Sequence, residues 1–274
     1  MNLSNLLPKV VSFFAGLLVK IVNKTLEYVS ERLEILAVFY RLFVTTFTTV
    51  AGIHLIFRET LRQIYLTSIQ GAHLFILVSL VLGMMVIVHS TQYLVKLQGD
   101  AYVGQLLVTI VVREVGPVLG ALFVLLRSGT AITAEIGTMS VTHEVDALKM
   151  LGIDPYRYLG LPRFWGLTIG LTALFIVSIF TSVLGGFLFA QIYADIYWNT
   201  FWLSFLNALQ WMDLVTGFTK VSLFGMFIAT VSIYFGLKAH HDLTYIGFYT
   251  SKATVMSLLL CGTVEVLLTT FYYL

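Results

Sequence analysis

Five charged residues interrupt the long apolar stretches of this sequence. They are Arg113, Glu114, Asp213, Lys220 and Glu265. A charged side chain at the centre of a bilayer costs about 2.5–3.5 kcal/mol, so such a residue normally faces a partner, a cavity or a water path. Two interpretations follow: buried ion pairs that hold helices together, or a polar patch in a transport cavity.

Lys220 is the most informative of the five. It follows Asp213 by seven residues, which is two helical turns, so both side chains are expected on one face of a helix. Its ammonium group suits the phosphate or carboxylate of a headgroup, and it equally suits neutralisation of Glu114 or Glu265. The sequence leaves both alternatives open.

Small residues at helical spacing follow the Arg113–Glu114 pair. Pro117 lacks an N–H and interrupts the helical hydrogen-bond ladder. Small residues four apart allow close contact between helices. The positions predicted to pack a neighbouring helix or a second subunit are Gly116, Pro117, Gly120, Gly129, Thr133 and Gly137. Arg127 and Glu135 lie farther along, where long side chains are expected to reach headgroups.

The composition indicates which elements must position these residues. The 274 residues are 58% hydrophobic and only 11% charged, against about 25% charged in soluble domains. A bilayer core about 30 Å thick needs about 20 apolar residues in helical form. Five stretches reach this length: Ile69–Val95, Ala101–Leu126, Phe164–Ala190, Leu214–Leu237 and Thr254–Leu274. The sequence therefore predicts an all-α integral membrane protein with five transmembrane helices and no large soluble domain.

The first sixty residues have a different pattern. Apolar residues between Val10 and Leu36 recur every three or four positions among charged ones, which is typical of an amphipathic helix lying in the membrane surface. The apolar segment Ile35–Phe57 is broken by Arg41 and His54, and we expect no sixth span there. The predicted domains are an N-terminal interfacial region, residues 1–62, and a five-span domain, residues 63–274.

Basic residues outside the spans predict the orientation. The N-terminal region and the connections after the second and fourth spans hold most of the lysines and arginines. The opposite side has Lys96, Asp100 and Asp195. We therefore expect a cytoplasmic N-terminus and a C-terminus on the far side of the membrane. A sixth span would reverse this pattern.

The connection between the second and third spans, residues 138–163, predicts a short cytoplasmic helix at about residues 142–152. Thr142 is a candidate N-cap, Gly152 suits the position after the last turn, and Pro155 prevents continuation. The apolar residues of this helix wrap too far round to be covered by the membrane surface alone, so a protein partner is expected. An ordinary interfacial loop helix is the alternative.

Motifs for catalysis or for cofactor binding are not found in the sequence. There is no G-x-x-x-x-G-K-[ST] loop for ATP, and no H-E-x-x-H, G-x-S-x-G or C-x-x-C motif. The single cysteine, Cys261, and the adjacent His240 and His241 do not predict a metal site. An intramembrane enzyme acting through Glu114 or Glu265 would lack a nucleophile and base at useful spacing. A net charge of +2 does not indicate nucleic acid as a partner.

Four motifs in a fixed order resemble the permeases of the Mla type, also called MlaE or YrbE permeases, which serve lipid-handling ABC transporters of bacterial envelopes and plastids. The motifs are REVGPVLGALFVLLRSGTAITAEIGTM (113–139), HEVDALKMLGIDPYRYLGLPRFW (143–165), DLVTGFTKVSLFG (213–225) and EVLLTTF (265–271). The resemblance covers about residues 60–274. It implies a homodimeric, five-span permease subunit of a bacterial inner membrane, preceded by an interfacial helix.

The resemblance also implies partners. These are a dimer of cytoplasmic P-loop ATPases that binds the ATP and Mg, an MCE-domain protein on the periplasmic side and, in some systems, a STAS-domain subunit. A central cavity in the dimer would hold phospholipid or another amphipathic lipid. Coupling to the ATPase is expected at His143, Glu144, Asp146, Leu148, Lys149, Gly152 and Asp154. Substrate binding or translocation is expected at Arg113, Glu114, Asp213, Lys220 and Glu265.

A structural membrane scaffold is the alternative from another functional class. The intramembrane charges of a scaffold would only hold its bundle together. A scaffold needs neither contact with an ATPase nor lipid in a central cavity.

Overall fold

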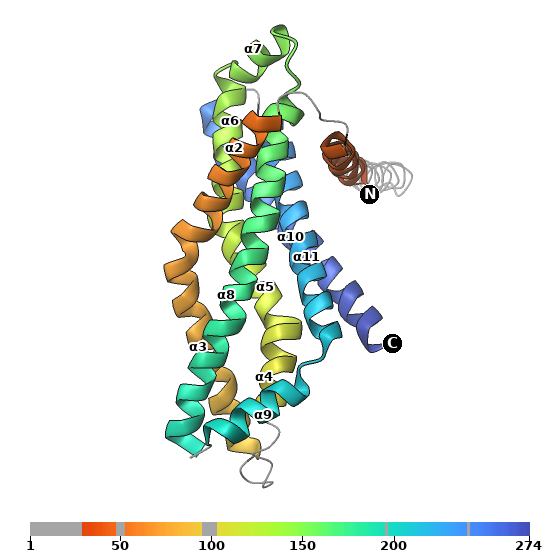
Figure 1. The fold of residues 1–274 in the computed structure, drawn as a ribbon. Helices are drawn as coiled ribbons and strands as arrows, with labels where there is room; N and C mark the ends of the chain where they lie inside the picture. Colours follow the sequence, from red (N-terminus) through yellow and green to blue (C-terminus); the bar gives the residue numbers. More distant parts are fainter. Residues whose placement is uncertain (1–28, 48–52, 95–102, 195–196, 240–241) are drawn as a thin grey trace, which may run out of the picture.

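The computed structural model describes residues 29–47, 53–94, 103–194, 197–239 and 242–274, and these residues are almost entirely helical. The long helices stand side by side with their axes roughly along one direction (Figure 1). The described residues contain five helices long and apolar enough to cross a membrane: Ile56–His89, Gly104–Val141, Tyr156–Ile192, Trp211–Lys238 and Leu243–Tyr273. The prediction of five transmembrane helices agrees with this architecture.

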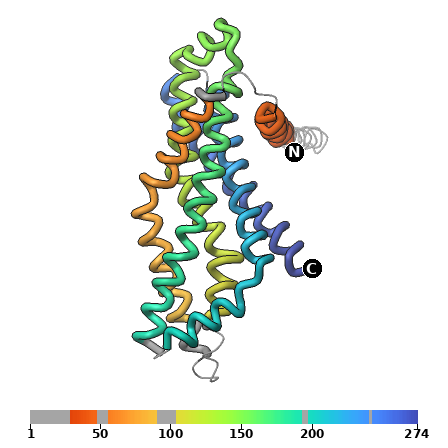
Figure 2. Tube along the Cα trace, in the orientation of Figure 1, coloured from red at the N-terminus to blue at the C-terminus, as the bar shows by residue number. Residues whose placement is uncertain are grey.

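Four of the five spans are assembled from consecutive helical elements and the fourth is a single helix; the path of the chain is traced in Figure 2. The first span comprises α2 (Ile53–Ile64), η2 (Tyr65–Ile69) and α3 (Gln70–Leu94); the second comprises α4 (Val103–Leu107), η5 (Val108–Val115), α5 (Gly116–Val124), η6 (Leu125–Gly129) and α6 (Thr130–Val141). After α7 (Glu144–Met150), the third span comprises η7 (Tyr156–Gly160) and α8 (Leu161–Ala194). After α9 (Trp198–Ala208), the fourth span is α10 (Trp211–Lys238), and the fifth comprises η8 (Leu243–Tyr245) and α11 (Ile246–Tyr273).

The first two spans extend beyond the predicted apolar stretches. The first begins near Ile56 and not at Ile69, because α2 is an amphipathic helix whose polar residues lower its apolar content without ending it. The second continues to Val141, past the predicted end at Leu126. The predicted domain boundary between residues 62 and 63 therefore falls inside α2.

Wide π-helical turns interrupt several spans. In η5 the N–H of Gly116 bonds to the carbonyl of Val111, five residues back, and Pro117 stands in the first turn of α5. The sequence predicted a break in the ladder here, and in the structure the π-helical segment η5 ends at this point and α5 begins. In η2 the N–H of Gln70 likewise bonds to Tyr65, which leaves the carbonyl of Leu66 without its usual helical donor.

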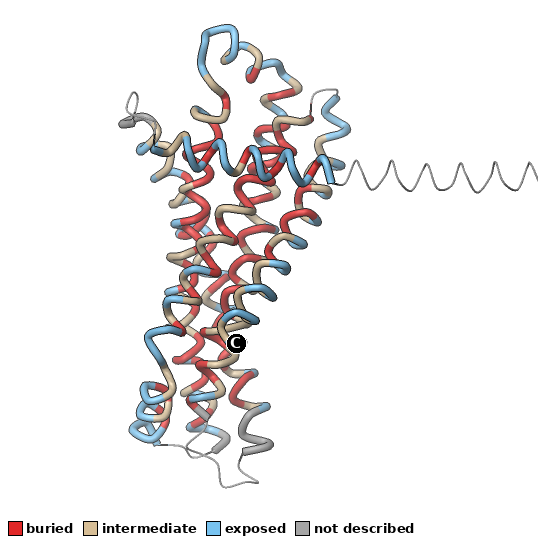
Figure 3. Tube along the Cα trace, turned by 90° about the vertical axis from the view of Figure 1, so that its right-hand side faces the viewer, coloured by how far each residue is buried: buried red, intermediate tan, exposed pale blue. Residues whose placement is uncertain are grey.

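The helix over residues 29–47 lies across the bundle and not along it (Figure 3). One stripe, Glu31, Ile35, Val38 and Leu42, is buried against the spans. Its other faces expose apolar side chains such as Leu33, Leu36 and Phe43. Residues 35–47 of the ambiguous segment Ile35–Phe57 thus belong to this transverse helix, and residues 53–57 begin α2. The predicted amphipathic pattern before residue 29 lies outside the described residues.

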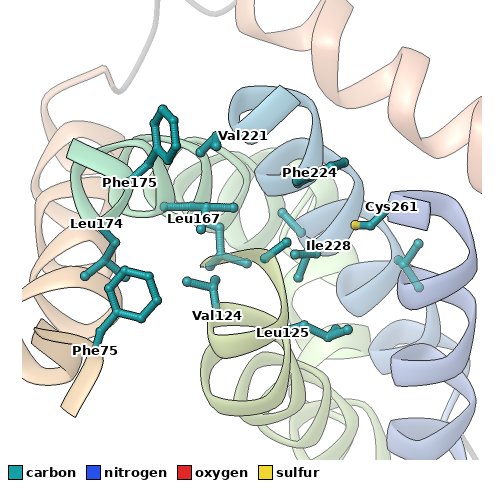
Figure 4. Packing of buried hydrophobic residues seen from close by; sticks show 14 of the residues in the cluster. Phe75, Val124, Leu125, Leu167, Leu174, Phe175, Val221, Phe224, Ile228 and Cys261 are labelled. Atoms are coloured by element: carbon teal, nitrogen blue, oxygen red, sulfur yellow. The ribbon is translucent and has the colours of Figure 1, made fainter. Parts of the chain in front are cut away.

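The core between the spans combines aromatic side chains with close glycine contacts. Phe75, Phe175 and Phe224 are buried in one cluster that joins α3, α8 and α10 (Figure 4). Helices α3 and α8 approach so closely at Gly83 that a Cβ placed there would lie 2.0 Å from the carbonyl oxygen of Ser182. This tight packing makes the spans a rigid frame for the polar residues between them.

Candidate functional site

Lys220 lies at the centre of a polar cluster within the bundle. From α10 its Nζ donates hydrogen bonds of 2.8 Å to Oε1 of Glu265, to Oγ1 of Thr269 and to the carbonyl of Arg113. A fourth acceptor, Oε2 of Glu114, lies 3.3 Å away. The side chain is only 3% exposed, so this ammonium is held entirely by groups of its own chain.

Pro117 explains one of these contacts. In a regular helix the carbonyl of Arg113 would accept the N–H of residue 117, which proline lacks. Lys220 donates to this carbonyl from a different span. The proline therefore creates an acceptor inside the bundle, and the lysine satisfies it.

A second ion pair joins the same spans. Arg113 places Nε 2.8 Å from Oδ1 of Asp213 and donates from Nη2 to Oδ2 at 3.1 Å. Tyr272 donates to Oδ1 at 2.6 Å, and the backbone N–H of Gln210 donates to Oδ2 at 3.0 Å. Asp213 is fully buried and forms a capping box with Gln210, so it both starts α10 and neutralises the arginine.

All five intramembrane charges singled out in the sequence come together, in two adjoining groups. Asp213 and Lys220 both face η5 and α11, as their seven-residue spacing predicted. Sequence reasoning missed Thr269 and Tyr272. They stand four and seven residues after Glu265, and that spacing is the helical signal that places all three on one face of α11.

An apolar cavity of about 380 Å³ begins at Glu265 and lies between α5, α10 and α11. Its lining consists of Val118, Ala121, Leu122, Leu125, Phe224, Leu258, Cys261, Gly262, Glu265 and Val266. Figure 4 places Phe224 and Cys261 between α10 and α11 at this level. Glu265 is the one charged residue of this lining, and its Oε2 is buried without a hydrogen-bond partner in the described part of the chain. A ligand with an apolar body and a polar end fits such a cavity.

The cavity borders the least covered span. Only 17% of the most apolar part of Leu243–Tyr273 is buried, against 33–50% for the other four spans. Leu258 and Val266 line the cavity and are also exposed on α11. The cavity therefore meets a face of α11 that the rest of this chain leaves open.

Arg127 and Glu135 make contacts within the chain. Nη1 of Arg127 donates at 3.0 Å to the carbonyl of Leu66, which the wide turn of η2 leaves without its usual donor. Glu135 accepts a hydrogen bond of 2.9 Å from Arg163, which was not singled out in the sequence. Both side chains therefore join spans in addition to any contact with headgroups.

The predicted small-residue positions pack against other spans of the same chain. Gly120 faces Leu171 of α8, and Gly129 faces Ile228 of α10. Thr133 is buried, with its hydroxyl bonded to the carbonyl of Gly129. Gly116, Pro117 and Gly137 also lie inside or beside this packing. Of the two predicted uses, packing of a neighbouring helix is the one visible within a single chain.

The short helix α7 protrudes beyond the bundle at the end where the second and third spans meet (Figure 1). Thr142 is not its N-cap as predicted: its hydroxyl bonds back to the carbonyl of Thr138, and His143 takes the cap position with φ of 60°. A left-handed residue here reverses the chain sharply after α6, which the sequence pattern did not reveal. Gly152 has φ of 73° and ends the segment as predicted.

Charged residues stiffen α7 and anchor it. Asp146 accepts from Lys149 at 2.9 Å and lies 3.3 Å from Nδ1 of His143. The hydrogen bond from Lys149, with that from His143, lowers the pKa of Asp146 below its usual range. Asp154 pairs with Arg41 of the transverse helix at 3.0 Å. Glu144 and Leu148 complete the predicted coupling set on α7.

The tip of α7 is apolar and uncovered. Met150 is 87% exposed and Leu151 is 75% exposed, whereas Val145 anchors the helix from a buried position. Exposed apolar residues at the end of a protruding element are typical of a protein-binding surface.

No group of three or more potential metal ligands occurs within the described ranges. Cys261 is buried beside the cavity, and burial of this kind is usual for a cysteine without redox function. His240 and His241 lie outside the described residues.

Comparison with known proteins gives consistent matches. The chain is 29% identical over 176 residues to "Intermembrane phospholipid transport system permease protein MlaE" of Haemophilus influenzae, covering 64% of this chain and 67% of the relative. It is 31% identical over 202 residues to "Probable ABC transporter permease protein slr1045" of Synechocystis, covering 74% and 77%. It is 28% identical over 216 residues to the chloroplastic protein TRIGALACTOSYLDIACYLGLYCEROL 1 of Arabidopsis thaliana, covering 79% and 62%.

The family model described as Permease MlaE matches residues 60–271. This range contains the five intramembrane charges, the apolar cavity, α7 and all five spans except the first few residues of the first and the last two of the fifth. A match of this extent shows that the chain belongs to the MlaE permease family.

Proposed function

We propose that this chain is the permease subunit of an ABC-type transporter that moves phospholipid between the inner membrane and an MCE-domain partner protein. The observation that carries the proposal is the apolar cavity that ends at Oε2 of Glu265, an atom with no hydrogen-bond partner among the described residues. Acyl chains fit its apolar walls, and a headgroup supplies a hydrogen-bond donor to the carboxylate. The name of the Haemophilus relative, which includes phospholipid transport, supports the same cargo.

The permease works as a homodimer in this proposal. The open face of α11 carries Val255, Leu259, Leu267 and Phe271, all exposed in the single chain. Two copies that meet on this face would close the cavity of each and create one central lipid chamber. The charged cluster lies beside that chamber, where Glu114, 31% exposed, is its most accessible member.

A dimer of cytoplasmic P-loop ATPases supplies the energy. The chain itself holds no cofactor in this proposal, and the ATP and Mg are bound by that partner. The exposed Met150 and Leu151 of α7 enter a groove of the ATPase, and the ion pairs of Asp146 keep α7 rigid during the stroke. The pair between Arg41 and Asp154 carries part of this motion into the transverse helix.

The orientation follows from the basic residues and the place of α7. The end that carries α7 faces the cytoplasm, and the transverse helix lies in the inner leaflet with its exposed apolar side chains in lipid. The C-terminus faces the periplasm, where an MCE-domain protein exchanges lipid with the chamber. A STAS-domain subunit is a further cytoplasmic partner in some systems of this kind.

The test is to isolate the tagged full-length chain from its native membranes in mild detergent and identify what accompanies it by mass spectrometry. The proposal expects a stoichiometric P-loop ATPase, an MCE-domain protein and bound phospholipid. A stable bundle with neither ATPase nor phospholipid would refute it and favour a structural scaffold.

The cavity has its own test within the same preparation. Leu258→Trp fills the apolar space and should reduce the phospholipid bound per chain by more than half, while Leu243→Trp, an exposed position outside the cavity, should leave it unchanged. Equal lipid content in both variants would mean that the lipid binds elsewhere.

A further inference from the structure

A second cavity, of about 530 Å³, lies at the α7 end of the bundle between α2, α6 and η7. It is separate from the cavity beside Glu265, which α5, α10 and α11 enclose. Its lining combines Ile56, Arg58, Glu59, Arg62, Glu135, Met139, Tyr158, Leu159, Pro162 and Arg163. Three arginines and two glutamates thus converge on one hollow at the membrane surface.

The ion pairs within this lining neutralise two of its three arginines. Arg163 is buried and bonds to Glu135 at 2.9 Å and to the carbonyl of Leu159 at 2.9 Å. Arg62 is paired with Glu59 at 3.4 Å. Arg58 is the remaining charge of the cavity, and it is exposed. The cavity therefore has the charge to complement a single phosphodiester group, and arginine binds such oxygens in a fixed geometry.

An apolar stripe begins beside the arginines. Phe57, Leu61, Tyr65 and Ile69 stand four residues apart on α2 and η2, and all four are at least half exposed. At a rise of 1.5 Å per residue, the stripe extends for about 18 Å along the span. That length matches one leaflet of a bilayer core about 30 Å thick.

We propose that this cavity binds the headgroup of an anionic phospholipid of the surrounding leaflet, with its phosphodiester at Arg58 and Arg62 and its acyl chains along the stripe from Phe57 to Ile69. Basic pockets between membrane helices bind lipid headgroups by the same physical chemistry. The site is lateral to the transport cavity, and the proposal requires only that the chain spans a membrane. It holds whether or not the central chamber carries phospholipid.

Photo-crosslinking tests the proposal on the full-length chain. The probe is phosphatidylglycerol with a photoactivatable headgroup, added to the purified protein in mixed micelles with phosphatidylcholine. We expect the probe to label the peptides that contain Tyr158 and Met139. Unmodified phosphatidylglycerol should compete for this labelling, whereas phosphatidylcholine and millimolar inorganic phosphate should not.

Variants locate the charge that is recognised. Arg58→Gln combined with Arg62→Gln should reduce labelling more than tenfold, at about fivefold for each arginine near an anionic headgroup. Arg58→Lys with Arg62→Lys keeps the charge and should retain most of the labelling. The matched control, Arg32→Gln, removes an exposed arginine of the transverse helix and should change nothing.

Three results would overturn the proposal. Equal labelling of the glutamine variant and the Arg32→Gln control would mean that the two arginines do not recognise the headgroup. Competition by phosphatidylcholine would mean that the cavity does not distinguish an anionic headgroup from a zwitterionic one. Competition by inorganic phosphate alone would assign the cavity to a free anion. Competition on the wild-type chain decides the question even if the glutamine variant fails to fold.

Discussion

Lys220 is a buried cation that serves several acceptors at once, and this makes its replacement more costly than the loss of one ion pair. Its ammonium contacts both Glu114 and Glu265, together with the carbonyl that Pro117 leaves free. Removing one partner of a buried pair leaves an uncompensated charge, whereas removing all partners together is often nearly neutral. The two interpretations of the cluster, structural lock and transport group, therefore predict different mutant patterns.

Lys220→Met should destabilise the protein by about 3–5 kcal/mol, because two carboxylates lose their counter-charge inside the bundle. Adding Glu114→Gln and Glu265→Gln should recover most of this loss. Thermal unfolding in detergent measures both changes. If the triple variant also transports lipid at the wild-type rate, the cluster is a structural lock; if it is stable but inactive, the charges take part in transport. Equal stability of Lys220→Met and wild type would contradict the contacts described above.

Glu34 provides a pH-dependent attachment of the transverse helix. It accepts a hydrogen bond from the hydroxyl of Tyr234, and this bond is the main reason that the pKa of Glu34 lies below its usual range. Nζ of Lys238 lies 3.7 Å from Oε2 of Glu34. A lowered pKa means that the attached state binds fewer protons than the released one. The stabilisation that Glu34 adds to the attachment is therefore complete above the ordinary glutamate value of about 4.3 and is lost as the pH falls through the lowered pKa, while the buried stripe from Glu31 to Leu42 still packs against the spans.

Spin labels at the exposed Leu36 and Leu243, in a cysteine-free background, measure this release as a broader distance distribution at acidic pH. Glu34→Gln should make the distance distribution depend less on pH than it does in the wild type. Glu144→Gln, which replaces a glutamate on α7, should leave that pH dependence unchanged. An identical acid response in wild type and Glu34→Gln would assign the response to other groups.

At the residue scale, the sequence predicted the charged positions and could not predict their pairing. The spacing of Asp213 and Lys220 was enough to place them on one face of a helix. Lys220 contacts both Glu114 and Glu265, the two carboxylates between which the sequence could not choose. That arrangement depends on the rotation and height of α11 relative to α10, and neither is encoded in the local pattern of one helix. Tyr272 was missed for the same reason, because a tyrosine near the end of an apolar helix is an ordinary interfacial residue until its neighbour is known.

At the scale of the elements, glycines set how closely α3 and α8 approach. Gly83→Ala would put a methyl group 2.0 Å from the carbonyl oxygen of Ser182, so the backbones must separate. We expect a loss of about 1–3 kcal/mol of stability, seen as a lower midpoint of thermal unfolding. Gly247→Ala on α11 is the matched control, since nothing lies within 4 Å of its added carbon. If both variants melt together, the close approach of α3 and α8 is not needed for stability.

The exposed tip of α7 should couple the permease to the ATPase without being needed for the stability of the bundle. Met150→Asp with Leu151→Asp changes two exposed apolar side chains and should abolish at least nine tenths of the permease-dependent stimulation of the ATPase, because a charged tip cannot enter an apolar groove. Leu243→Asp, an exposed residue of η8, is the control and should retain the stimulation. Unchanged stimulation in the α7 variant would refute its role as the coupling element.

The elements were predictable where one strong local signal dominates. Apolar length predicted five spans, and Gly152 with Pro155 predicted the end of α7. The start of α7 was predicted wrongly, because a histidine in the left-handed conformation replaces the side-chain cap that Thr142 indicated. The extension of the first span through α2 was missed because Arg58, Glu59 and Arg62 look like a boundary until the fold shows that they line a polar cavity and that Glu59 pairs with Arg62.

At the scale of the whole molecule, the single chain is uneven in how well it covers its own spans. Four spans bury a third to a half of their most apolar part within the chain, but α11 buries much less. Lipid can cover an apolar face, so exposure alone does not require a second subunit. The additional fact is that the cavity beside Glu265 meets this same face and stays incomplete without a cover.

A crosslinking experiment distinguishes a second copy from lipid as that cover. Leu267→Cys, on the exposed face of α11, and Val81→Cys, on the exposed face of α3 at the other side of the bundle, are placed separately in a Cys261→Ser background (Figure 1). A short bismaleimide reagent in native membranes should join most Leu267→Cys chains into dimers and few Val81→Cys chains. Addition of Leu259→Asp, which puts a charge on the α11 face, should abolish the dimer. Equal crosslinking at both positions would reflect random collision in the membrane, and the cavity would then be closed by lipid or by another protein.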